Sequence, residues 1–130
     1  MYYTRREIKE RIDYFDVINY ALTRIFQIRT EFNSMRSNVV YTYFIRYVVA
    51  VRALFMLVKP IVPSIEKYEE IFKEIVRKGN KEGEYFACAW KIDGIVMKIV
   101  EELNKAGLLF REVRVKVSSI GGGHDTLRSD

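Results

Sequence analysis

The side chains that most often carry out chemistry in proteins are scarce in this chain. Its 130 residues include one histidine, His124, and one cysteine, Cys88. A zinc site of the usual kind needs several His and Cys ligands, and a Ser or Cys nucleophile needs a base beside it. Two such residues cannot supply either arrangement. The sequence therefore predicts no enzyme, no metal site, no cofactor and no small-molecule substrate.

Two further patterns only partly match functional motifs. The glycines Gly121 to Gly123 are followed by His-Asp, whereas a phosphate-binding loop continues with Lys and Ser or Thr and opens a helix. Four acids near the N-terminus could suggest a cation site, but basic residues alternate with them. We interpret this stretch as an ion-paired solvent face. Its acids are Glu7, Glu10, Asp13 and Asp16, and its basic residues are Arg5, Arg6, Lys9 and Arg11.

The net charge of +5 is unevenly distributed along the chain. Residues 1–60 contain ten Lys and Arg against five acids, and residues 61–110 contain eight against nine. A basic half suits contact with nucleic acid or anionic lipid, and it is also typical of an ordinary solvated surface. The sparing use of Gln and Cys beside many Lys, Arg and Glu residues is typical of hyperthermophile proteins. An amphipathic start, in place of an apolar signal segment, favours an intracellular location.

The stretch that must position everything else is residues 38–59, which holds only three charges, Arg46, Arg52 and Lys59. As a helix it is about 30 Å long and apolar on most faces. It is long enough to cross a membrane, but two arginines near its middle each cost roughly 2.5 to 3.5 kcal/mol there. We therefore predict a central helix covered by protein.

Periodic apolar residues predict three more helices. The first spans residues 4–32 and begins at the capping box Thr4 to Glu7. The next spans 64–78, between the bend at Pro60 and Pro63 and a terminal Gly79, and the last spans 81–106. The sequence thus predicts an all-α protein, an antiparallel four-helix bundle (residues 1–110) followed by a C-terminal extended strand or arm and a flexible Gly-rich tail (111–130). Alternating valines at 110–117 are the strand signal, and the strand could pair within the chain, pair with another subunit, or remain an extended arm.

An alternative interpretation places a turn at Asp93-Gly94. Residues 68–117 then resemble a winged helix-turn-helix domain, with DGIVMKIVEELNKAGLL as the recognition helix and FREVRVKV as the first wing strand. The resemblance implies a DNA-binding regulator (residues 64–118) that dimerises through its N-terminal helical hairpin. Its candidate nucleic-acid-binding residues are Lys91, Lys98, Arg111, Arg114 and Lys116.

The preferred interpretation is a non-catalytic interaction or assembly protein, similar to small helical proteins of archaeal mobile elements. The central helix is apolar on more faces than three neighbours readily cover, so we expect a homodimer or higher homo-oligomer. The residues expected to contact a second copy are Phe44, Val48, Val51, Phe55 and Trp90.

Overall fold

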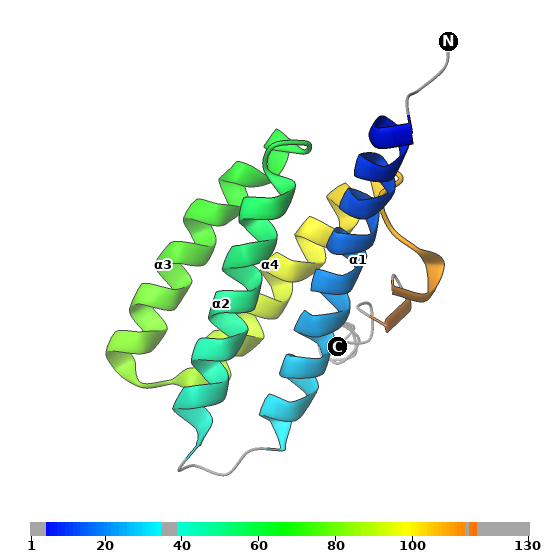
Figure 1. Ribbon diagram of the computed structural model, residues 1–130. Coiled ribbons are helices and arrows are strands. Elements are labelled where there is room, and N and C mark those ends of the chain that lie inside the picture. Colours follow the sequence, from blue (N-terminus) through cyan, green and yellow to red (C-terminus); the bar gives the residue numbers. More distant parts are fainter. Residues whose placement is uncertain (1–4, 35–38, 114, 117–130) are drawn as a thin grey trace.

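The computed structural model describes residues 5–34, 39–113 and 115–116, and side chains from Tyr14 onward within these ranges. Its helices are α1 (Arg5–Asn33), α2 (Val40–Val58), the 3-10 turn η1 (Pro63–Ile65), α3 (Glu66–Glu82) and α4 (Tyr85–Lys105). Figure 1 shows α3, α2 and α1 side by side, with successive helices running in opposite directions and α4 passing behind them. The expected all-α bundle is confirmed.

The central position of the 38–59 stretch is also confirmed, because α2 packs against α1, α3, α4 and η1. Its buried side chains belong to the hydrophobic core of the bundle. They are Val40, Phe44, Tyr47, Val51, Leu54, Phe55 and Val58.

The junction between α3 and α4 differs from the prediction. The helix continues past Gly79 to Glu82 and ends at Gly83, whose φ of 70° is the left-handed cap conformation. Gly79 lies inside α3 because α4 comes close there: a Cβ on Gly79 would lie 2.5 Å from Cys88 Cβ. The small Cys88 side chain permits this close contact between the helices. At the start of the next helix, Ser64 donates its hydroxyl to the Glu102 carboxylate at 3.3 Å.

Helix α4 runs without interruption through Asp93 and Gly94. A helix-turn-helix requires a break there, so the winged helix-turn-helix interpretation is wrong as a fold. The reason is tertiary: Asp93 is 2% exposed and is bound inside the bundle, whereas a turn would bring its carboxylate to the surface.

The alternating valines near the C-terminus do not form a strand in the part of the chain that the structure describes. Residues 111–113 and 115–116 are helical. Val113 is 8% exposed and Val115 is 62% exposed, so the two valines do not share a buried face. Residues 108–110 are non-helical. The helical residues at 111–113 and 115–116 differ from the extended arm predicted from residue 111 onward, and the Gly-rich tail lies outside the described residues.

Candidate functional site

A buried ion pair joins α1 and α4. Arg29 Nε lies 2.8 Å from Asp93 Oδ1 and 3.1 Å from Oδ2, and the two side chains are 10% and 2% exposed. From α2, the Tyr47 hydroxyl donates to Asp93 Oδ1 at 2.5 Å. Arg29 Nη1 also donates to Asn33 Oδ1 at 2.5 Å. Three helices therefore meet at one carboxylate.

The surroundings of this ion pair explain why it tolerates burial. The Arg29 guanidinium lies over the rings of Phe32 and Tyr47, 5.4 and 5.8 Å from their centroids. Burial raises the pKa of Tyr47 well above its ordinary value, and the negative charge of Asp93 adds to the rise. Tyr47 therefore stays protonated and remains a donor at neutral pH. A charge held this way fixes how helices pack, and neither described groove is lined by these side chains, so we assign the cluster to structure.

Sequence reasoning missed this cluster. Arg29 had no assigned role, and Asp93 was regarded as a possible turn residue or a member of the apolar series. The available signal was that Asp93 occupies a core position of α4, where a carboxylate requires a partner.

The largest exposed apolar feature of α2 is a strip that points away from α4. We call it the outer strip, made of Ile45, Val49, Ala53 and Met56. Val49 is 59% and Met56 is 65% exposed, Ala53 is exposed, and Ile45 is half-buried. Its members recur every three or four residues, which is the spacing by which one helix packs along another.

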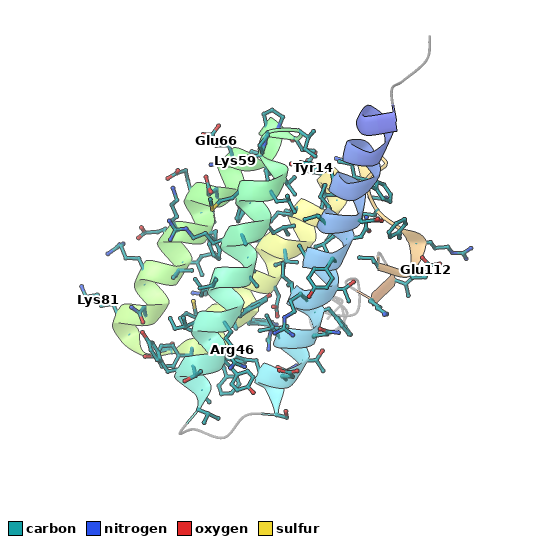
Figure 2. The ribbon with its side chains drawn as sticks, in the orientation of Figure 1. Tyr14, Arg46, Lys59, Glu66, Lys81 and Glu112 are labelled. Atoms are coloured by element: carbon teal, nitrogen blue, oxygen red, sulfur yellow. The ribbon has the colours of Figure 1, made fainter. Side chains whose placement is uncertain are left out.

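Two arginines lie on opposite edges of the outer strip. The Arg46 guanidinium lies over the Tyr43 ring, 4.9 Å from its centroid, on the edge next to α1. Figure 2 shows Arg46 near the N-terminal end of α2. Arg52 turns toward α3 and lines a groove of about 340 Å³ with Phe72 and Val76. The middle of the strip is thus left apolar.

The two halves of helix α3 have net charges of opposite sign. Residues 66–74 hold the acids Glu66, Glu69, Glu70 and Glu74 against Lys67 and Lys73, and residues 75–82 hold Arg77, Lys78 and Lys81 against Glu82. Figure 2 places Glu66 and Lys81 at the two ends of the helix. On its other side, α3 forms a groove of about 410 Å³ with α4, lined by Ile71, Ile75 and Ala87 among several glutamates.

The residues expected to contact a second copy divide into two groups. Phe44, Val51 and Phe55 are fully buried in the core of this subunit, so the prediction that they contact another copy does not agree with their burial. They face inward because neighbouring helices cover this side of α2, as Tyr85 of α4 does for Phe44 and Phe72 of α3 does for Phe55. Val48 is half-buried beside α3, and Trp90 on α4 is 46% exposed.

The candidate nucleic-acid-binding residues are not brought together on one helix end. Lys98 is exposed and lies 3.7 Å from Glu101 on its own helix, and Lys91 lines the groove between α3 and α4. Arg111 and Lys116 are exposed after the non-helical residues 108–110. Arg114 lies outside the described residues.

The residue types capable of catalysis or metal binding do not form a site where the structure describes them. In the described ranges no group of three or more His, Cys, Asp or Glu side chains could hold a metal ion. Cys88 is 3% exposed, and burial raises the pKa of its thiol to about 11, partly offset by the charge of Lys91. His124, Gly121 to Gly123, and the side chains of Glu7, Glu10 and Asp13 lie outside the described residues.

By length and composition alone, α2 could cross a membrane. It is the one described helix with this property, and 33% of its most apolar 18-residue window is buried. The core helix of a soluble protein satisfies the same criterion. The side of α2 that is not buried differs from a uniformly apolar membrane-facing surface, because it contains two arginines beside the outer strip.

The chain matches no model of a protein family, no curated protein and no solved structure. Its function therefore has to be inferred from the geometry of its own residues.

Proposed function

We propose that this protein is a non-catalytic helical interaction protein that forms a homodimer by packing the outer strip of α2 against the same strip of a second copy. The carrying observation is the exposure of Val49 and Met56 on the most apolar helix of the bundle. Contiguous exposed apolar surface on a soluble protein is typical of an interaction site. An intracellular location is part of the proposal, because the only cysteine is a buried free thiol.

The spacing of side chains along the outer strip allows an antiparallel pair. In an antiparallel pair with its two-fold axis between residues 49 and 53, Val49 packs on the small side chain of Ala53 from the other copy. Each such contact then occurs twice, as an isologous interface requires.

The charges of α3 support the same orientation. Because α3 lies beside α2 in the layer of three helices, an antiparallel α2 pair also brings the two copies of α3 together in opposite directions. The acidic first half, with Glu66, then faces the basic second half, with Arg77 and Lys81. Such rim pairs are each worth about 0 to 1 kcal/mol, and they contribute mainly to orientation.

Size-exclusion chromatography with light scattering tests the proposal. The wild type is expected at twice the mass of one chain, and Val49→Glu is expected at the mass of one chain with unchanged helical content. Ile71→Glu is the matched control, since Ile71 is 49% exposed on α3 and lines the groove on the other side of that helix. It should remain dimeric.

Two results would contradict the proposal. One is a monomeric wild type at micromolar concentration. The other is a wild type that floats with lipid vesicles while Val49→Glu does not, because the outer strip would then contact a membrane instead of a second copy.

A further inference from the structure

After α4 the chain turns back and lies on α1. Gly107 makes this turn with a φ of 71°, and the amides of Gly107 and Leu108 donate to the carbonyls of Asn104 and Leu103 at 3.1 and 3.0 Å. The next three residues, Leu108 to Phe110, are the non-helical segment that we call the arm.

The arm is bound by a buried amide side chain on α1. Asn19 is 2% exposed, and its Nδ2 donates to the Leu108 carbonyl at 3.0 Å and to the Phe15 carbonyl at 2.8 Å. Its Oδ1 accepts from the Phe110 amide at 2.8 Å. A side-chain amide carries both donors and an acceptor, so one orientation of Asn19 satisfies all three partners. Asn19 therefore recognises a carbonyl and an amide two residues apart in another segment, independently of that segment's side chains.

Apolar contacts add to this backbone recognition. The Phe110 ring meets the Phe15 ring edge to face, with centroids 4.6 Å apart. Leu108 and Leu109 are half-buried against the core. Backbone hydrogen bonds combined with neighbouring apolar contacts are the way proteins bind extended peptides.

We infer that Asn19 and Phe15 form a binding site for an extended apolar peptide, a site that the protein's own arm occupies and that the arm of a second copy can occupy in exchange. The second copy carries the same Leu-Leu-Phe segment, so it reproduces every contact described above. The connection to α4 is Gly107, at which an added Cβ would meet nothing within 4 Å. Rotation at this residue redirects the arm and breaks only the hydrogen bond from the Leu108 amide to the last turn of α4, and such exchange of an identical element is a low-cost route to association.

This exchange does not depend on the outer strip of α2. On α1, Tyr14 donates its hydroxyl to the Leu57 carbonyl of α2, whereas Asn19 points to the arm. The side of α1 that contacts α2 therefore differs from the side that binds the arm. Pairing through the outer strip can be lost without loss of arm binding, and arm binding can be lost without loss of pairing.

A labelled peptide with the sequence of residues 106–116 tests the site. The acceptor is the full-length protein with Leu109→Asp and Phe110→Asp, which release its own arm; Phe110→Asp alone replaces the pair if the double variant does not fold. Fluorescence anisotropy should show binding at least ~10-fold tighter than to the wild type, whose tethered arm competes at a high effective concentration.

Adding Asn19→Leu should abolish peptide binding. Thr23→Ala is the matched control on the next turn of α1, because the Thr23 hydroxyl donates only to the backbone carbonyl of Asn19, at 2.9 Å. It should leave binding unchanged. Two results would overturn the assignment. One is that the folded arm-released variant does not bind the peptide, and the other is that adding Asn19→Leu leaves the binding unchanged.

Exchange between copies is tested by mixing two variants in a Val49→Glu background, which removes pairing through the outer strip. One carries Asn19→Leu, with an intact arm, and the other carries the arm-releasing changes, with an intact site. Light scattering should show a one-to-one complex in the mixture and single chains when each is alone. If Asn19→Leu does not fold, Phe15→Ala takes its place. Two folded variants that stay separate would exclude exchange.

Discussion

Helix α4 is held against α1 and against α3 by different means. The backbones of α1 and α4 stay apart, and the Arg29–Asp93 ion pair and the edge-to-face contact of Phe32 with Phe86 join the two helices. On the other side α3 and α4 approach closely, at Gly79 and Cys88. The ion pairs within α3 stay outside, as in Arg77–Glu74, whose side chains are 66% and 63% exposed, whereas the buried Glu69 pairs with Lys59, the residue that follows α2.

The difference shows two ways of specifying a helix contact. A buried ion pair accepts few alternative positions, because any shift of α1 against α4 leaves a charge without its partner. Two helices approach closely only where their side chains are small, so adding a single carbon atom at such a contact causes a steric clash. Exposed ion pairs specify little, because water replaces a lost partner.

Asp93→Ala should have the largest effect on stability. It leaves the Arg29 guanidinium buried without its carboxylate, and removing one partner of a buried ion pair costs about 3 to 5 kcal/mol. Urea unfolding followed by circular dichroism measures the change. Glu74→Ala, which breaks the exposed pair with Arg77, should change the free energy of unfolding by less than about 0.5 kcal/mol. Equal losses in both variants would remove the distinction between the two contacts.

Tyr47→Phe should have a smaller effect. It keeps the ring in the core and removes the hydroxyl that donates to Asp93. A hydrogen bond to a charged group contributes about 1.5 to 3 kcal/mol. Tyr43→Phe is the control on the same helix, since the Tyr43 ring contacts Arg46 and its hydroxyl has no hydrogen bond among the described residues. A control variant that loses as much stability as Tyr47→Phe would contradict the role of the buried hydroxyl.

Gly79→Ala should destabilise the contact between α3 and α4 by about 1 to 3 kcal/mol, because the new methyl group collides with Cys88. Gly94→Ala is the matched control inside α4. A Cβ there meets nothing within 4 Å, so the change should stabilise the protein by up to about 1 kcal/mol through helix propensity. Thermal melts of the two variants should move in opposite directions, and movement in the same direction would show that the α3–α4 contact is loose.

The smallest effect is expected from alkaline pH. The folded state holds the Cys88 pKa at about 11, above its ordinary value of 9.0, so the folded thiol keeps its proton when the unfolded thiol loses it. Its stabilising effect is complete below pH 9 and is lost as the pH rises to about 11. The raised pKa of Tyr47 acts in the same direction above pH 10. Urea unfolding at pH 7, 9 and 11 should show a shallower decline for Cys88→Ala than for the wild type. Parallel declines would mean that burial does not protect the thiol.

Much of the fold could be predicted from local patterns. The apolar period of Ile18, Leu22 and Ile25 indicated α1, and the prolines at 60 and 63 marked the bend before α3. The error at Gly79 arose because a glycine that ends a helix and a glycine that admits a neighbouring helix are the same residue in sequence. The surface of α2 was predicted only in part. Because α2 carries apolar side chains on most of its faces, its pattern could not show which of them are buried. Phe44, Val51 and Phe55 face inward. Val49 and Met56 face outward.

The sequence by itself determined the helices, their order and the apolar central stretch, because these depend on residues within a few turns of one another. Only the tertiary structure decided that Arg29 meets Asp93, 64 residues away, and that Asn19 binds the arm about 90 residues later. A core position such as that of Asp93 indicates that a polar side chain needs a partner, but the periodic pattern does not show which residue the fold brings to it.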